Sequence, residues 1–250
     1  MSISTVFVVK NAIMQGYCFW ESLQSCLPIS DEIIISEGYS GDGTYQVLLD
    51  FKKQYENTLP ITIYRDGWED KSYHGEVIAN VSNRAIEKAT KERVYYLQAD
   101  EVIHEDNVGV IKKLGNSNHF NSFSFKFYHF IRSWEPSRDG YGEAIRMITK
   151  GKGIKLKGDG WDFEGDIYPM CPSFSFPKPI YHFAWCFPKS DDIKDIEHAK
   201  IYANIPEYQE KMKKACSNIR EEKQAYPIGN FDDFPKLARR FVGQKEYVLP

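Results

Sequence analysis

Four short apolar runs divide the first part of the chain, each of a length typical of a β-strand. They lie at residues 5–9, 32–36, 61–64 and 94–97 and are rich in Val, Ile and Tyr. Because these runs are almost continuously apolar, we expect strands that are covered on both faces.

Between these runs the apolar residues take up a helical spacing. They recur every fourth residue over 47–55 and again over 77–89. Strands that alternate with helices predict a parallel sheet wound by right-handed crossovers. Such a sheet binds its ligands outside the carboxyl ends of its strands, so the strand exits are the place to look for chemistry.

The second half of the chain has a different pattern. Residues 122–127 alternate between Phe and polar residues, as in a half-buried strand, and 144–148 and 153–157 predict further short strands between glycine-containing turns. We therefore expect a mixed or antiparallel extension of the sheet. The apolar spacing over 212–219 favours a helix, and 233–237 favours a last short one with Pro in its first turn.

The charge balance argues against nucleic acid as a partner. In 250 residues, 32 Lys and Arg stand against 35 Asp and Glu, which gives a net charge of −3 with no basic cluster. Aromatic residues make up 15% of the chain, an ample supply of flat apolar surface for cores and ligand platforms.

The same survey predicts a cytoplasmic protein. No apolar run approaches the ~18 residues of a membrane span, and the N-terminus lacks the basic flank of a secretory signal. The five Cys are scattered without a CxxC pair, so we expect buried thiols rather than a zinc site or disulfides.

Two adjacent carboxylates, Asp100 and Glu101, follow the fourth predicted strand. A carboxylate on rigid backbone at a strand end is a good ligand for Mg²⁺ or Mn²⁺, which leave coordination positions open for substrate phosphates. The alternative is a solvated acidic turn.

The second strand also leads into a distinctive segment. Residues 37–44 read Glu-Gly-Tyr-Ser-Gly-Asp-Gly-Thr, and their glycines allow a ligand to approach the backbone. Glu37 could accept hydrogen bonds from a nucleoside, and Asn11 and Asp66 stand at the exits of the first and third strands. The alternative is an ordinary strand-to-helix turn with Asp42 and Thr44 as caps.

Together, segment 37–44 and the Gln-Ala-Asp sequence at 98–100 resemble the signatures of family 2 glycosyltransferases of the GT-A fold. The resemblance covers roughly residues 3 to 105. The chain departs from the family pattern twice, because Glu37 stands where Asp is usual and Gln98 replaces the first Asp of the metal motif.

The resemblance implies an α/β, Rossmann-like fold, with a mostly parallel sheet and helices on both faces. It also implies a nucleotide-sugar donor, commonly a UDP-sugar, bound with Asn11, Glu37 and Asp66 near the nucleoside. Asp100 with Glu101 would hold Mn²⁺ or Mg²⁺. Residues 181–185, Tyr-His-Phe-Ala-Trp, resemble a late element of a bacterial subgroup, which makes His182 a candidate metal ligand. A histidine buried in an aromatic cluster is the alternative.

An inverting transfer needs a carboxylate base for the acceptor hydroxyl. Glu143 matches the family placement of an acid before an Arg-containing strand, and Asp162 is the next candidate. Asp159, Glu164 and Asp166 compete for this role, and their acidic, Gly-rich loop could instead shape the acceptor pocket.

We expect one domain over residues 1–250, with a donor-binding half at 1–105 and an acceptor-binding half with C-terminal helices at 106–250. The acceptor would be a glycan, a lipid-linked sugar or another hydroxyl compound. Trp134 and Trp161 are candidate sugar-stacking faces. Residues 236–242 mix basic and apolar groups, so they either dock on the domain body or contact the inner face of a membrane.

Two rival functions stay open. A non-catalytic nucleotide- or glycan-binding module is credible because of Gln98. A nucleotidyltransferase would carry an early Gly-rich, basic phosphate loop, and residues 10–16 do not have that sequence. The oligomeric state is open.

Overall fold

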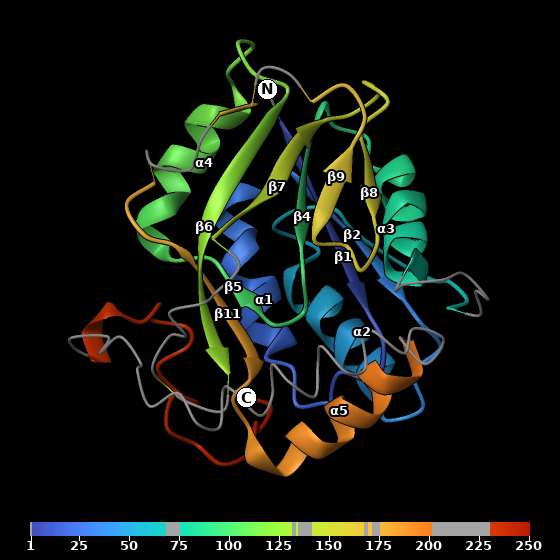
Figure 1. Cartoon of the computed structure of the whole chain (residues 1–250), viewed down its shortest axis with the longest axis vertical. Coiled ribbons are helices and arrows are strands. Elements are labelled where there is room, and N and C mark those ends of the chain that lie inside the picture. The colour runs from blue at the N-terminus through green and yellow to red at the C-terminus, as the bar shows by residue number, and fades with distance from the viewer. Residues whose placement is uncertain are drawn as a thin grey trace.

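A single large sheet organises the chain in the computed structural model, which describes residues 2–68, 76–131, 134, 142–167, 170–171, 176–201 and 231–250. Among these residues the strands of the nine-stranded sheet run in the order β3-β2-β1-β4-β7-β6-β11-β5, with β10 beside β6. The expected α/β fold class is confirmed, and both predicted halves of the chain contribute strands to this sheet (Figure 1).

The first half follows the sequence prediction closely. Its elements are β1 (Ile3–Val9), α1 (Phe19–Cys26), β2 (Glu32–Glu37), α2 (Thr44–Tyr55), β3 (Ile61–Arg65), α3 (Glu76–Lys88) and β4 (Arg93–Leu97). The four strands pair in parallel. β1, β2 and β4 are buried along their whole length, because α1 and α2 pack on one face of the sheet and α3 on the other.

The second half adds the antiparallel extension. Its elements are β5 (Glu101–Val102), α4 (Val108–Gly115), β6 (Ser122–Ile131), β7 (Glu143–Thr149), β8 (Lys155–Lys157), β9 (Asp162–Glu164), β10 (Met170–Cys171), β11 (Ile180–Trp185) and α5 (Pro188–Ile201). β7 runs antiparallel to both β4 and β6. β8 and β9 form a separate hairpin that packs over α3.

The C-terminal segment docks on the body of the domain. Phe234, Ala238 and Phe241 are buried in an aromatic cluster with Phe130 and Phe183 of β6 and β11. The apolar side chains of 236–242 thus pack against the body of the domain, with Leu237 and Val242 partly buried. No described helix is long and apolar enough to cross a membrane.

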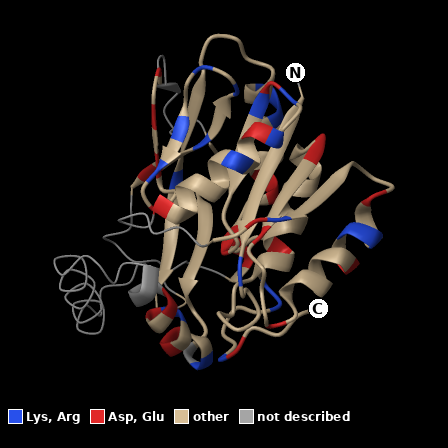
Figure 2. Cartoon of the chain, turned by 90° about the vertical axis from the view of Figure 1, so that its right-hand side faces the viewer, with Lys and Arg blue, Asp and Glu red and all other residues tan. Residues whose placement is uncertain are grey.

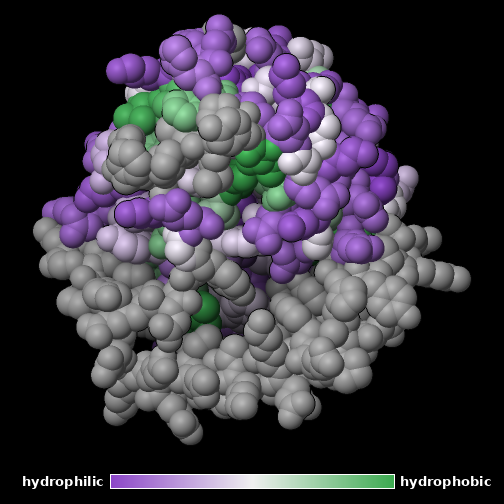
Figure 3. All heavy atoms as spheres, turned by 45° about the horizontal axis from the view of Figure 1, so that its top comes forward, coloured by the Kyte–Doolittle hydropathy of each residue, from purple (hydrophilic) through white to green (hydrophobic). Residues whose placement is uncertain are grey.

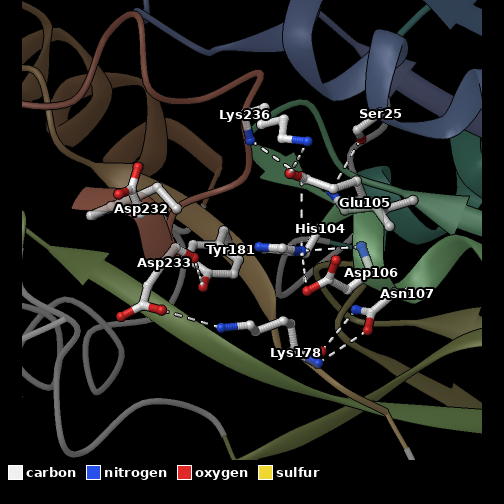
Figure 4. Close-up of polar contacts among 12 residues, drawn as sticks. Ser25, His104, Glu105, Asp106, Asn107, Lys178, Tyr181, Asp232, Asp233 and Lys236 are labelled. Carbon is white, nitrogen blue, oxygen red and sulfur yellow. Dashed lines mark hydrogen bonds and ion pairs between the residues drawn. The ribbon is translucent and has the colours of Figure 1, made fainter. Parts of the chain in front are cut away.

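Polar contacts fasten the same segment (Figure 4). Lys178 pairs with Asp233 at 3.3 Å, and the hydroxyl of Tyr181 donates to the carbonyl of Asp233 at 2.6 Å. The expected helix near 233–237 is instead a single 3₁₀ turn, Phe231–Asp233, followed by turns. The helix expected over 212–219 lies outside the described residues.

Lys, Arg, Asp and Glu are interspersed over the described elements in the side view of Figure 2. Figure 3 brings the top of Figure 1 forward, where β1 begins, and its described surface is mostly hydrophilic. At the opposite end, α5 lies across the foot of the sheet beside the strand exits (Figure 1).

Candidate functional site

The exit loops of β1 and β2 are tied into one unit. Asn11 adopts a left-handed backbone conformation (φ 51°), which Asn tolerates better than most residues. Its side-chain oxygen accepts from the N–H of Gly41 at 3.0 Å, and its own N–H donates to the hydroxyl of Ser40 at 2.8 Å. The N–H of Ala12 donates to the hydroxyl of Thr44 at 2.9 Å, so Asn11 is held at the start of α2.

Glu37 is buried inside this pair of linked loops. Its side chain is fully buried, and its two oxygens accept from the N–H of Ser40 at 2.5 Å and from Nε of Arg65 at 2.7 Å. The Arg65 guanidinium lies 4.4 Å from the ring of Tyr39 and 4.6 Å from that of Tyr45. This corrects the expectation that the Glu37 carboxylate faces a nucleoside, because its oxygens are already used to hold the loop.

Asp66 lies at an accessible position at the exit of β3, beside these two loops. Its N–H donates to the carbonyl of Glu37 at 2.9 Å, and its carboxylate accepts from Nε of Arg84 at 2.8 Å. Asp66 lines a cavity of about 520 Å³ together with Tyr64, Arg65, Arg84, Glu87 and Lys88. A ligand can therefore reach Asp66.

Asp100 and His182 meet at the end of β4. Nε2 of His182 lies 3.3 Å from the Asp100 carboxylate, and both side chains are almost buried. The N–H of Phe183 donates to the Asp100 carbonyl at 2.8 Å, which anchors β11 beside the exit of β4. Nδ1 of His182 is 2.6 Å from Nδ1 of His129, its register partner on β6.

This environment determines the protonation of Asp100 and His129. Burial opposes ionisation of Asp100, but the charge and hydrogen bond of His182, with the charge of Lys194, outweigh it and hold the pKa of Asp100 well below 3.8. Burial lowers the pKa of His129 to about 2, and the neighbouring His182 adds to this effect. At neutral pH Asp100 is therefore a carboxylate and His129 is neutral.

Glu101 has a different place from the one expected. Its carboxylate accepts from Nε and Nη2 of Arg146 at 2.6–3.1 Å, and both side chains are completely buried. The Arg146 guanidinium also lies 4.7 Å from the ring of Trp161 and 4.9 Å from that of Phe127. Glu101 therefore links the start of β5 to β7, and its carboxylate is engaged by Arg146 rather than directed to a metal ion beside Asp100.

The described residues fit the expected metal site poorly. Gln98 supplies a neutral amide, directed to the carbonyl of Gly160 at 3.5 Å, and Glu101 is engaged by Arg146. Over the part of the chain that the structure describes, no three His, Cys, Asp or Glu side chains are grouped to hold a metal ion. Asp100 and His182 form only a pair of possible ligands.

The two candidate bases are both exposed. Glu143 opens β7 and accepts from the hydroxyl of Ser124 at 3.2 Å. Asp162 opens β9, directly after Trp161, whose ring centre lies 5.4 Å from that of His129 and 6.3 Å from that of His182. Trp161 thus connects the β8–β9 hairpin to the side chains around Asp100, which we call the rim.

Trp134 behaves differently from Trp161. Its ring lies 5.6 Å from Phe187 and 6.2 Å from Phe241, within the cluster that holds the C-terminal segment. Its partly buried ring packs within this cluster, and its role as a sugar-stacking face stays a prediction.

Sequence reasoning missed Arg146, His129 and Lys194 as members of this site. In the sequence, Arg146 could pair with a donor phosphate or form a surface ion pair, and neither role was assigned. His129 lies within the aromatic strand β6, where the Phe pattern of 122–127 ends, and Lys194 lies on a helix that no apolar periodicity predicts.

No family model and no curated protein matches the sequence. Among solved structures, the chain is similar to S. aureus TarS 1-349, with 14% identity, a TM-score of 0.50, and coverage of 73% of this chain and 60% of that one. At this identity the likeness bears on the fold alone, and it agrees with the GT-A-like architecture.

Two further structures show weaker likeness. TarS 1-349 from S. aureus in complex with UDP-GlcNAc gives 18% identity and a TM-score of 0.41 over 57% of this chain and 36% of that one. Mannosyltransferase PcManGT from Pyrobaculum calidifontis, in complex with GDP-Man and Mn²⁺, gives 12% identity and a TM-score of 0.43 over 69% and 56%. The chain thus spans well under two thirds of the length of these structures.

Proposed function

We propose that this protein is a glycosyltransferase that moves a sugar from a nucleoside-diphosphate-sugar donor, with a UDP-sugar as the first candidate, to a hydroxyl acceptor. The observation that carries the proposal is the buried Asp100 carboxylate, kept ionised beside His182 at the exit of the fourth parallel strand. The resemblance of segments 37–44 and 98–100 to family 2 glycosyltransferases supports it.

The nucleoside would lie over the exits of β1 and β3. Asn11 and Asp66 are the proposed contacts, since Asn11 belongs to the tied loop and Asp66 borders a cavity. Glu37 would not contact the nucleoside itself but would position the loop, because it holds Ser40 and Arg65 in place. Residues 1–105 would thus form the donor half, and residues 106–250 the acceptor half of one domain.

The chemistry would follow the inverting course. A carboxylate, Glu143 first and Asp162 next, takes the proton of the acceptor hydroxyl. The acceptor oxygen then forms its bond to the anomeric carbon as the bond from that carbon to the phosphate oxygen breaks, and the electron pair leaves with the nucleoside diphosphate. Both carboxylates are exposed, as a group that meets an incoming acceptor must be.

The expected Mn²⁺ or Mg²⁺ stays a prediction. Asp100 and His182 are the described side chains that would hold it, and it would supply positive charge to the diphosphate. Glycans, lipid-linked sugars and other hydroxyl compounds are the acceptor classes of the proposal, with a cytoplasmic location.

Donor turnover tests the proposal. Purified protein is incubated with a panel of UDP-sugars and GDP-sugars, and release of the nucleoside diphosphate is measured for wild type, Asp100→Ala and the surface control Asp50→Ala. We expect turnover in wild type and the control, and none in a folded Asp100→Ala protein. Full activity of Asp100→Ala would contradict the proposed role of Asp100.

A second candidate is a non-catalytic nucleotide- or glycan-binding module. Gln98 at the first motif position and the engagement of Glu101 by Arg146 favour it. Calorimetry with UDP and the donor panel together separate the two. A nucleotide-binding module binds UDP in the calorimeter but releases no nucleoside diphosphate from any donor of the panel.

A further inference from the structure

Lys194 is a buried ammonium group at the edge of the candidate site. It lies on α5, and only 1% of the residue is exposed. Its Nζ donates to the carbonyl of Ala184, and it lies 4.3 Å from the ring centre of Tyr17 and 5.9 Å from that of Trp185. A carbonyl and two aromatic faces thus surround the charge.

The same group has no close counter-ion. No carboxylate among the described residues lies within ion-pair distance of its Nζ. Burial lowers the pKa of Lys194, and the charge of Asp100 is the strongest influence that raises it again. The buried Asp191 on the same helix raises it as well. Because a buried charge is unfavourable without a contacting partner, a further negative group close to Lys194 would be stabilised.

The position of Lys194 is fixed from two sides. Ala184 directly follows Phe183, whose N–H donates to the Asp100 carbonyl. α5 is also pressed against the exit loop of β1, since a Cβ atom built on Gly16 would lie 2.2 Å from the hydroxyl of Ser190. The ammonium therefore sits between the exits of β1 and β4, where a diphosphate of the proposed donor would lie.

We propose that Lys194 binds the diphosphate of the donor and supplies there the positive charge that a divalent ion was expected to give. This inference rests on the proposed function. Among the described residues, Ala184 takes one of the three ammonium hydrogens, and the other two would serve phosphate oxygens. When the bond to the anomeric carbon breaks, the leaving diphosphate gains negative charge, and the ammonium stabilises it. The incomplete metal ligand set at Asp100 and His182 is then explained.

Calorimetric titration with UDP tests this assignment. Protein freed of metal with EDTA is compared with protein in Mn²⁺, for wild type, Lys194→Met, Lys194→Arg and Lys189→Met. Lys189 is the matched control, because it lies on the same helix but is 65% exposed and paired with Glu246. We expect wild type and the control to bind UDP in EDTA, Lys194→Met to bind at least about tenfold more weakly, and Lys194→Arg to fall between them.

The outcomes separate the two proposals. If wild type binds UDP only with Mn²⁺ and Lys194→Met binds equally well, this inference is overturned while the proposed function stands. If wild type binds no nucleoside diphosphate with or without Mn²⁺, the proposed function fails first. Circular dichroism checks folding. Should Lys194→Met not fold, wild-type binding in EDTA decides, since binding supports the assignment and loss of binding contradicts it.

Discussion

The tied loops at the exits of β1 and β2 and the rim around Asp100 hold their polar groups in opposite ways. In the loops, backbone N–H groups and small side chains share many hydrogen bonds of 2.5–3.0 Å, as at Asn11 and Glu37. At the rim, whole charges are buried: Arg146 pairs with Glu101, Asp100 lies beside His182, and Lys194 donates to the carbonyl of Ala184.

The difference separates two kinds of preorganisation. Many modest bonds fix the shape of the loops, so each one carries little of the stability. A few concentrated charges define the rim, so each one matters more, and they shape the electrostatic field that a charged ligand meets. Single substitutions should therefore have unequal effects in the two regions.

The largest effect is expected at the rim, from Arg146→Met. This change leaves the Glu101 carboxylate completely buried without its partner, so we expect a loss of about 3–5 kcal/mol in the free energy of unfolding, measured by urea denaturation. The double variant Glu101→Leu with Arg146→Met removes both charges and should recover most of this loss.

Arg84→Met is the matched control. It breaks the pair with Asp66, in which the arginine side chain is 45% exposed, so the cost should stay below about 1 kcal/mol. Equal losses for Arg84→Met and Arg146→Met would remove the proposed contrast between exposed and buried pairs.

A smaller effect is expected from His129, and it depends on pH. Because the pKa of His129 is lowered to about 2, the unfolded chain binds a proton below pH 6.5 that the folded protein does not bind. The stability that neutral His129 contributes is complete above pH 6.5 and falls as the pH drops. The slope is at most about 1.4 kcal/mol per pH unit.

His129→Phe removes this titration. The difference in unfolding free energy between wild type and the variant should shrink by about 2 kcal/mol between pH 7.5 and pH 5. A pH-independent difference would mean that His129 has the same pKa in the folded and the unfolded protein, which would contradict the lowered pKa described for the rim.

The sequence predicted the parallel strands and the place of Asp100 after the fourth of them, because both depend on local patterns. It could not predict the direction of Glu101, because Arg146 lies 45 residues away and reaches it only through the antiparallel placement of β7. Glu37 was misjudged for a related reason, since its partner Arg65 comes from the neighbouring strand. Lys194 was missed because α5 lacks an apolar stripe.

The smallest effect is expected in the tied loops, from Glu37→Gln. The amide keeps the shape of the side chain but loses the charge that strengthens its bonds to Ser40 and Arg65, so we expect a loss of about 1 kcal/mol by urea denaturation. The exposed control Glu56→Gln should stay within about 0.5 kcal/mol of wild type. A loss at Glu37 as large as at Arg146 would show that the loops also depend on single charges.

The central claim is that the rim around Asp100 binds a nucleoside diphosphate, and a thermal-shift panel of UDP, GDP and ADP, each with EDTA or with Mn²⁺, tests it most directly. Ligand at a hundred times its Kd adds about 2.7 kcal/mol to the stability of the folded state, which corresponds to about 5–10 °C in Tm. We predict such a rise for at least one nucleotide in wild type and a much smaller one in Asp100→Ala. An unchanged Tm with every nucleotide, or an equal rise in Asp100→Ala, would contradict the account.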